Sequence, residues 1–277
     1  MTKTTVKGAY QIEVFEGGQL IEDTGEFRNL ITDLALAESA PFSSGVLCIG
    51  EGSTAPTVAD ISLESELAAK SGAFGSASTI IMQHGKRYGR RSITVSFDNI
   101  TGNVSEVGFR GGDVNSVRSR TIVRDGNGLA TIIPIKPEQT LKITYSVYIL
   151  IPDVLATGTV TTPYGASLFT IKPHAGLVSP AGIFAGDFNN PFLGGGLKAI
   201  LTDGSVNADV FTWTYDTATR TATATVNFNA IDTNRTIVGF VSASNPVNLP
   251  VIELDTPLIN PGQNDCSFTL SFTWDRA

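Results

Sequence analysis

The chain has 277 residues, of which 42% are hydrophobic and 16% are charged, and its formal net charge at pH 7 is −7. This composition excludes a fully disordered chain, since such chains bury too little apolar surface to offset the conformational entropy lost on folding. The acidic balance argues against a general nucleic-acid binder, which needs clustered Lys and Arg to neutralise phosphates.

The chain also lacks the usual signals of a membrane protein, a secreted protein or an enzyme. Its longest apolar run, residues 147–151, is far shorter than the roughly 20 residues that span a bilayer, and its start lacks a signal-peptide apolar stretch. Cys48 and Cys266 lie too far apart for a local metal site, so we expect reduced, buried thiols. With only His84 and His174, the chain is poor in the commonest acid–base side chain. We therefore expect a soluble, non-enzymatic protein without a cofactor.

Strands dominate the predicted elements. Apolar and polar residues alternate with period two, which is typical of a strand with one buried and one wet face, in residues 93–97, 141–147, 211–215, 222–228 and 268–274. The fold class that follows is all-β and antiparallel. A further strand is expected around Tyr10 to Phe15, and we expect it to leave an unpaired sheet edge.

Helical signals are few and short. Asn29 is a candidate N-cap for a segment through Glu38, and Asp60 for another through Lys70. Leu63 and Leu67 would share one face of the second helix.

Two dipeptides, Asp125-Gly126 and Asp203-Gly204, are typical of hairpin turns.

An internal repeat links the two halves of the chain. Residues 94–109, TVSFDNITGNVSEVGF, align without gaps on residues 225–240, TVNFNAIDTNRTIVGF, with eight of sixteen positions identical. In both halves a Pro-x-Gln motif precedes the last alternating strand. This pattern predicts two tandem β-sandwich domains, residues 1–151 with one or two short helices and residues 152–277. Phe97 should then correspond to Phe228, and Phe109 to Phe240, with all four side chains buried.

Catalytic interpretations are weaker than structural ones. No Gly-x-Ser-x-Gly elbow accompanies the histidines, and most acidic residues lie in turn-like contexts where they cap backbone amides. A carboxylate pair for glycoside hydrolysis needs only two acids, so the sequence leaves it open. The basic residues near position 120 suit a solvated face or ion pairs with an acidic patch on a neighbouring copy. The apolar excursion 184–193 suits a partner contact. The interface residues that we predict are Tyr10, Phe15, Arg118, Arg120, Arg124, Phe184, Phe188 and Phe192.

Five segments, in this order, resemble a family of tailed-bacteriophage virion structural proteins that are often labelled tail fibre or tail proteins. They are FRNLITD at 27–33, IGEGSTAP at 49–56, VSEVGF at 104–109, SRTIV at 119–123 and KPEQTLKITY at 136–145. The resemblance covers residues 27 to 150. The second half shares it only through the repeat and lacks the Asn-Leu-Ile-Thr and Thr-Ala-Pro segments. The resemblance implies a β-rich building block, present in many copies, with no catalytic residues to carry over.

These observations predict a tail-associated structural protein of a virion (tail fibre, baseplate or neck) that is synthesised in the host cytoplasm. Its partners would be other copies of itself and other virion proteins, joined by symmetric assembly. Two alternatives remain open: a capsid decoration protein, and an adhesin that binds a host surface glycan through exposed aromatic side chains such as Tyr164, Phe188 or Trp213. A polysaccharide depolymerase is a third, enzymatic alternative.

Overall fold

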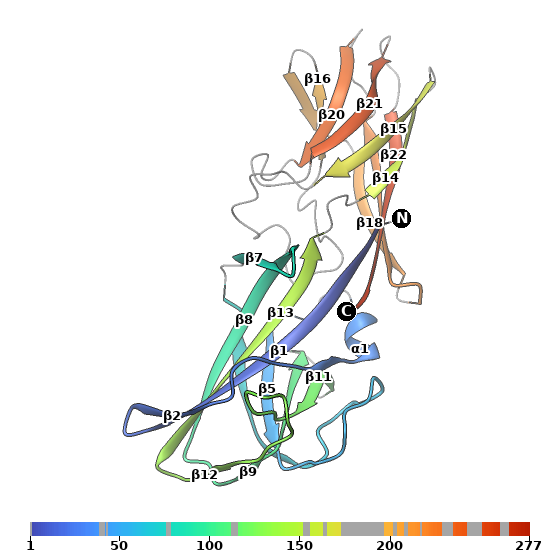
Figure 1. The fold of residues 1–277 in the computed structure, drawn as a ribbon. Helices are drawn as coiled ribbons and strands as arrows, with labels where there is room; N and C mark the ends of the chain where they lie inside the picture. The colour runs from blue at the N-terminus through green and yellow to red at the C-terminus, as the bar shows by residue number, and fades with distance from the viewer. Residues whose placement is uncertain are drawn as a thin grey trace. The chain divides into compact units, whose positions relative to one another are not determined.

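The computed structural model is built mostly of β-strands, arranged in antiparallel sheets, and has almost no helix among the residues it describes (Figure 1). The all-β, antiparallel prediction is confirmed at this level. The structure describes residues 2–38, 42, 44–75, 79–111, 116–151, 156–162, 165–172, 197–201, 204–207, 210–216, 218–228, 235–242, 251–260 and 266–277.

The chain divides into two compact units, each described here by itself. The first unit comprises Thr5–Ser78, Arg90–Ile149 and Arg276–Ala277, and the second comprises Met1–Thr4, Thr79–Gly89 and Leu150–Asp275.

The first unit holds two main antiparallel sheets. One is five-stranded, with the order β4-β11-β10-β5-β6, and the other has the order β1-β13-β8, with β2 and β3 also paired to β1. A two-stranded sheet, β9 with β12, is separate. The bounds are β1 Thr2–Glu16, β2 Gln19–Asp23, β3 Phe27–Arg28, β4 Leu30–Ile31, β5 Ser44–Gly50, β6 Glu66–Ala73, β8 Lys86–Asp98, β9 Gly102–Val104, β10 Glu106–Gly111, β11 Val117–Ile122, β12 Ile133–Ile135 and β13 Gln139–Ile151.

Period-two burial is clearest in β8 and β13, which confirms both predicted strands. Ile93, Val95 and Phe97 are buried on β8, while Thr94 between them is exposed. On β13, residues 141, 143, 145 and 147 are fully buried. Successive side chains of a strand point to opposite faces, so these apolar residues all reach one core.

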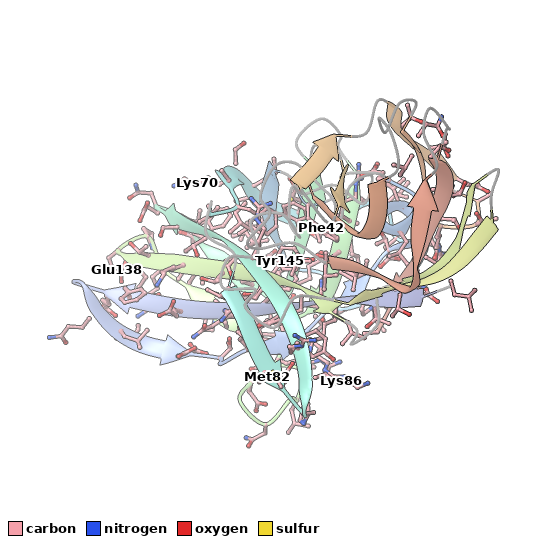
Figure 2. The ribbon with its side chains drawn as sticks, turned by 90° about the horizontal axis from the view of Figure 1, so that it is seen from above. Phe42, Lys70, Met82, Lys86, Glu138 and Tyr145 are labelled. Carbon is pink, nitrogen blue, oxygen red and sulfur yellow. The ribbon has the colours of Figure 1, made fainter. Side chains whose placement is uncertain are left out.

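Aromatic rings from both sheets fill that core. The Tyr145 ring of β13 stacks on Tyr10 of β1, with centroids 4.6 Å apart, and on Phe109 of β10, with centroids 5.2 Å apart. Phe74 meets Phe109 edge-on at 5.5 Å, and Phe42 lies 6.4 Å from Tyr145 (Figure 2). Because β10 and β13 belong to different sheets, these contacts show that the two sheets pack face to face.

The helical predictions meet different outcomes. A helix does lie within 29–38, but it is the single turn α1, Asp33–Leu36, and its N-cap is Thr32, whose hydroxyl accepts from the Ala35 amide, instead of Asn29. The helix predicted from Asp60 to Lys70 is wrong. That segment is an irregular loop followed by strand β6, and the amides of Glu64 and Ser65 bond to the distant Glu106 carboxylate.

Both predicted turns fall at strand connections. The Asp125 carboxylate accepts hydrogen bonds from the amides of Asn127 and Leu129, both at 2.9 Å, which is the side-chain-capped turn expected there. Residue 203 of the other turn lies outside the described residues, and Gly204 begins β17.

The strands of the second unit follow one path of pairings, β17-β16-β20-β21-β15-β14-β22, with β19 paired to both β18 and β22. The alternating stretches 211–215, 222–228 and 268–274 lie in β18, β19 and β22, as predicted. Residues of β7 and the start of β8 are also assigned to this unit. The bounds are β7 Thr79–Gln83, β14 Ala156–Thr162, β15 Gly165–Lys172, β16 Leu197–Leu201, β17 Gly204–Asn207, β18 Val210–Asp216, β19 Thr221–Phe228, β20 Arg235–Ser242, β21 Val251–Asn260 and β22 Cys266–Arg276.

The structure tests the predicted burial for two of the four phenylalanines of the repeat. Phe97 and Phe109 have exposed fractions of 4% and 0%, as predicted. The backbones of Phe228 and Phe240 lie in β19 and β20, and their side chains are outside the described part of the structure.

Candidate functional site: a loop held by a buried ion pair

The predicted interface residues of β1 are engaged inside the fold. Tyr10 is fully buried, and its hydroxyl lies 2.6 Å from the hydroxyl of Ser119. Strand β1 pairs with β13 along residues 6–16, and on its other side with β3 and β2. The expected open edge at Tyr10 to Phe15 is therefore closed by strands of the same chain. Phe15 is half-buried, with the Lys142 ammonium 5.7 Å from its ring centroid.

The three predicted arginines also have partners in their own chain. Arg118 is 1% exposed and forms an ion pair with Glu38. Arg124 is half-buried and donates to the Gly128 carbonyl at 2.8 Å. Arg120 is 4% exposed and lies at the centre of the network described next. Arg118 and Arg120 are thus not available as exposed docking groups. Phe184, Phe188 and Phe192 lie outside the described residues.

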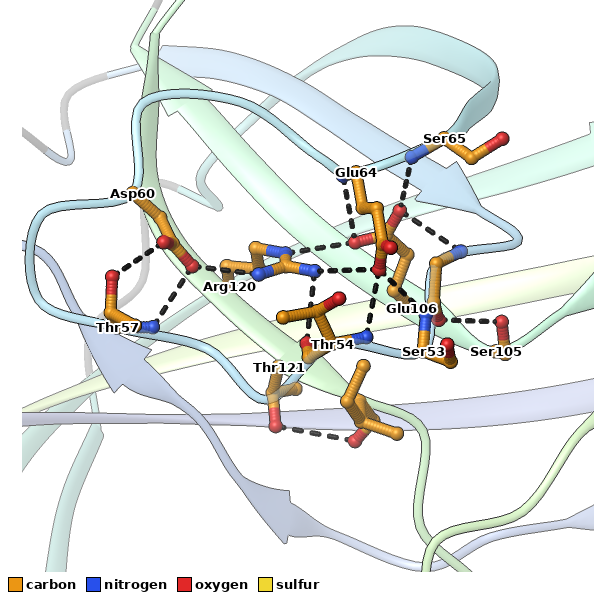
Figure 3. Close-up of polar contacts among 12 residues, drawn as sticks. Ser53, Thr54, Thr57, Asp60, Glu64, Ser65, Ser105, Glu106, Arg120 and Thr121 are labelled. Atoms are coloured by element: carbon orange, nitrogen blue, oxygen red, sulfur yellow. Dashed lines mark hydrogen bonds and ion pairs between the residues drawn. The ribbon is translucent and has the colours of Figure 1, made fainter.

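Glu106 and Arg120 form a buried ion pair between the neighbouring strands β10 and β11, with Arg120 Nε 2.8 Å from Glu106 Oε2 (Figure 3). The glutamate side chain is fully buried. Its carboxylate also accepts three backbone amide bonds, from Gly52 at 3.1 Å, Glu64 at 3.2 Å and Ser65 at 2.8 Å. A buried carboxylate is tolerated when it is paired and hydrogen-bonded in this way.

The guanidinium of Arg120 holds the other side of the same loop. Its Nη1 donates to Asp60 at 2.7 Å, and its Nη2 donates to the Thr54 carbonyl at 3.1 Å. Asp60 in turn accepts from the Thr57 amide and hydroxyl, and Glu64 accepts from the amides of Ser53 and Thr54 (Figure 3). We call Glu106, Arg120, Asp60 and Glu64 the clasp, and residues 51–65, which they hold, the clasped loop.

Electrostatics favours the charged form of every clasp member with a resolved shift. Burial opposes ionisation of Asp60, but hydrogen bonds from Thr57 and Arg120 outweigh it and hold the pKa of that carboxyl below its usual value. Amide bonds from Thr54 and Ser53 lower the pKa of Glu64. Burial works against the Arg120 cation, yet its bonds to Asp60 and Glu106 raise its pKa. Asp60, Glu64 and Arg120 therefore stay ionised at neutral pH.

Two glycines give Glu106 its space. A Cβ added at Gly52 would lie 2.4 Å from Glu106 Oε1, and one at Gly50 would lie 2.7 Å from the same atom and 2.5 Å from the Ser65 carbonyl. Any side chain at these positions would force the carboxylate or the loop to move. The Gly-x-Gly of the sequence thus has a steric explanation.

Four of the five segments that carry the resemblance meet at or beside the clasp. IGEGSTAP supplies Gly52, Ser53 and Thr54; VSEVGF supplies Glu106; and SRTIV supplies Arg120. The FRNLITD segment joins them through β4, in which Leu30 pairs with Arg120. Motifs that lie far apart in the chain therefore build one local structure.

The clasp is suited to positioning a loop. The Glu106 carboxylate and the Arg120 guanidinium are bound to each other, to Asp60 and to backbone groups of the loop. In the described part of the chain, no group of three or more His, Cys, Asp or Glu is placed to hold a metal ion. Cys48 is a free, buried thiol, as predicted; burial raises its pKa to about 11, despite the opposing effect of Arg110 beside it. The Cys266 side chain is not described.

Comparison with known proteins leaves the family assignment open. No protein-family model, curated protein or solved structure matches this chain. Within the described residues, no helix has both the length and the apolar character required to cross a bilayer.

The sequence contains no sign that Glu106 is buried. In strand β10, Glu106 and Arg110 alternate with Val107 and Phe109, a pattern that places the glutamate on a solvated face. Its burial depends on the loop that folds over it. The sequence did single out Arg120, but for a solvated face or an ion pair with a neighbouring copy. Its acidic partners, Glu106 and Asp60, belong to the same chain.

Proposed function

We propose that this protein is a structural component of a tailed-bacteriophage virion, associated with the tail, and that it works by assembly with copies of itself and with other virion proteins. The observation that carries the proposal is the meeting of four resemblance segments around Arg120. Segments that build one three-dimensional unit share a physical reason to occur together and in order. They are thus a stronger basis for a family resemblance than scattered matches.

The clasped loop supports an assembly role. Residues 53–55, 57, 59, 61 and 62 of the loop are exposed, and Ile61 has an exposed fraction of 65%. The buried clasp beneath fixes the backbone of this surface before any partner arrives. A preorganised loop loses little conformational entropy on binding, which favours docking to another protein. Under this proposal the protein carries no catalytic site.

We also propose that the chain arose by duplication of one β-sandwich domain. The pairing order β4-β11-β10-β5-β6 of the first half has a counterpart in β15-β21-β20-β16-β17, and β1-β13-β8-β7 has a counterpart in β14-β22-β19-β18. The paired elements occur in the same chain order in both halves. Strands β2, β3, β9 and β12 and helix α1 are additions of the first half.

Pairing of individual residues supports the same duplication. The hydroxyls of Thr94 on β8 and Thr144 on β13 lie 3.0 Å apart, and the repeat places Thr225 at the position of Thr94. Thr225 pairs with Thr269 of the corresponding strand β22. In both halves, the corresponding strand pair therefore places two threonines side by side.

The strand pairing gives the Glu106–Arg120 pair no counterpart among the described residues of the second half. Position 106 corresponds to Ile237 in the aligned repeat. Gly108 pairs with Arg120, whereas its counterpart Gly239 pairs with Glu253. An apolar residue and a glutamate therefore stand where the first half has the ion pair, so the proposed docking loop belongs to the first half alone.

The test is to locate the protein on intact particles. Particles produced by the host that encodes the chain would be purified, analysed by mass spectrometry and labelled with gold-conjugated antibody for electron microscopy. Label at the tail in regular copy number is the expected result. Label on the head would favour the decoration-protein alternative, and absence from purified particles would refute the proposal. Normal particles that lose host attachment when the protein is deleted would favour the adhesin.

A further inference from the structure

Strand β2 forms an exposed sheet edge. It follows the two-residue turn Gly17-Gly18, in which both glycines have positive φ, 59° and 82°, and it pairs with β1. Among the described residues no second strand pairs with β2, and all five of its side chains are exposed. Its backbone can therefore accept another strand.

This edge is both apolar and acidic. Leu20 and Ile21 have exposed fractions of 50% and 51%. Strand β2 carries Glu22 and Asp23, Glu16 precedes the turn, and the sequence from Ile12 to Phe27 contains no basic residue. Two further acidic residues of this stretch, Glu13 and Glu26, are paired with Lys142 and Arg90 of the same chain. Two β2 edges would bring like charges together, which disfavours pairing between identical edges.

Strand β7 forms a second exposed edge, of the opposite charge. It is the terminal strand of its sheet in the described structure, and the turn His84-Gly85 joins it to β8. Met82 on β7 is 65% exposed, and the exposed Lys86 opens β8 beside it (Figure 2). Lys86 and Arg87 begin β8 directly after this turn, and the sequence from Lys70 to Phe97 contains no acidic residue. Arg90, further along β8, is already paired with Glu26 of its own chain.

We propose that β7 of one copy adds as a strand to β2 of a second copy. Main-chain hydrogen bonds would supply the pairing, and contact of Met82 with Ile21 on one face of the combined sheet would bury apolar surface that is otherwise exposed to solvent. The opposite charges select β2–β7 pairing over β2–β2 and β7–β7 pairing and speed the encounter.

The contact joins different surfaces of two identical chains. A pair of copies keeps one free β2 edge and one free β7 edge, so further copies add head to tail and form a ring or a filament. The inference deepens the assembly role proposed above and rests on it in one respect: a chain that acts alone would have no second copy to meet.

A charge-swap series tests the pairing in purified full-length protein. Glu22→Lys and Lys86→Glu should each weaken self-association about tenfold or more in sedimentation experiments at low salt. The double variant carries both swaps and should recover association, because the two edges again have opposite charges. Glu138→Lys and Lys136→Glu reverse exposed charges elsewhere in the first unit and serve as matched controls (Glu138 in Figure 2). Equal effects of all four single variants, or no recovery in the double variant, would overturn the proposal.

Cross-linking tests the geometry directly. Ile21→Cys protein and Met82→Cys protein would be mixed and treated with a short bismaleimide, in a background with Cys48 and Cys266 replaced by serine. Covalent dimers should form in the mixture and far less in either protein alone. Dimers in the separate proteins at the same yield would indicate pairing of identical edges and refute the inference. Circular dichroism and thermal unfolding confirm that each variant is folded.

The inference and the proposed function can fail separately. If the protein is found in particles and the charge swaps leave both self-association and incorporation unchanged, the edge pairing is wrong and the virion role stands. If β2–β7 pairing occurs in solution and the protein is absent from particles, the virion role is wrong and the pairing stands.

Discussion

At the scale of single residues, the clasp shows how one buried charge organises a loop. Glu106 has no solvent to stabilise its charge, so Arg120 and three backbone amides replace the lost hydration. Because the amides belong to residues on both ends of the clasped loop, the carboxylate determines the path of the backbone there.

We predict that Arg120→Leu lowers the free energy of unfolding by about 3–5 kcal/mol, because it leaves the fully buried Glu106 charge unpaired. Denaturant unfolding measures the effect. Arg124→Leu is the control, since Arg124 is half-buried and bonds to one carbonyl; it should cost less than about 1.5 kcal/mol. Adding Glu106→Gln to Arg120→Leu should recover part of the loss. Equal costs for the two arginine variants would contradict the role of the clasp.

At the scale of elements, the strands follow alternation and the clasped loop follows long-range bonds. Residues 93–97 of β8 and 141–145 of β13 alternate between buried and more exposed side chains, and their apolar side chains reach the core. The clasped loop has little regular structure of its own, and its amides bond to Glu106, Glu64 and Asp60. The strands should therefore be sensitive to loss of buried apolar side chains, and the clasped loop to loss of charge on its carboxylates.

Phe97→Ala should destabilise the protein by about 3–5 kcal/mol, because its ring, 4% exposed on β8, leaves a cavity in the core. Thr94→Ser on the exposed face of the same strand should change stability by less than about 0.5 kcal/mol. Urea unfolding of both variants gives the comparison. Small, similar effects would mean that the buried face of β8 is misassigned.

Acid should loosen the clasped loop. The pKa of Asp60 is lower in the folded chain than in the unfolded chain, so its ionised form stabilises the fold above the unfolded value of about 3.9, and this stabilisation is lost as pH falls through the folded pKa. Amide hydrogen exchange of residues 51–65 should accelerate below about pH 4 relative to β13. Asp60→Asn should reduce this pH dependence. Unchanged pH dependence in that variant would locate the acid response elsewhere.

At the scale of the whole molecule, the last residues of the chain belong to the first unit. Arg276 donates to the Ile31 carbonyl at 3.1 Å and to the Asp33 carboxylate at 2.5 Å, and the Ala277 amide donates to the Val6 carbonyl at 2.9 Å. These bonds join residues more than 240 positions apart in the chain. They couple the end of β22 to α1 and β1.

Arg276→Ala should therefore lower the free energy of unfolding by about 1 kcal/mol, a modest amount because the ion pair with Asp33 is partly exposed and screened by solvent. Thermal unfolding of the full-length variant would show the shift. The control is Lys136→Ala, which removes an exposed side chain and should have no measurable effect. An equal loss of stability in both variants would argue against a specific role for Arg276.

The sequence by itself determined the features that depend on neighbouring residues. Period-two alternation identified β8, β13, β18, β19 and β22, because a strand exposes alternate faces regardless of what it packs against. It also identified the burial of Phe97 and the turn at Asp125, whose carboxylate bonds to amides two and four residues away.

Only the tertiary structure decided the features that depend on residues far apart in the chain. Residues 60–70 carry local helix signals, but the amides of Glu64 and Ser65 bond to Glu106, about 40 positions away, and the helix does not form. Strand β1 has the pattern of an edge strand, yet β13, more than a hundred residues later, closes one of its sides. Arg120 finds Asp60 and Glu106 within its own chain, because β10 and β11 are neighbours and the loop folds over them. Local patterns contain no information on such partners, since their proximity is a product of the sheet topology.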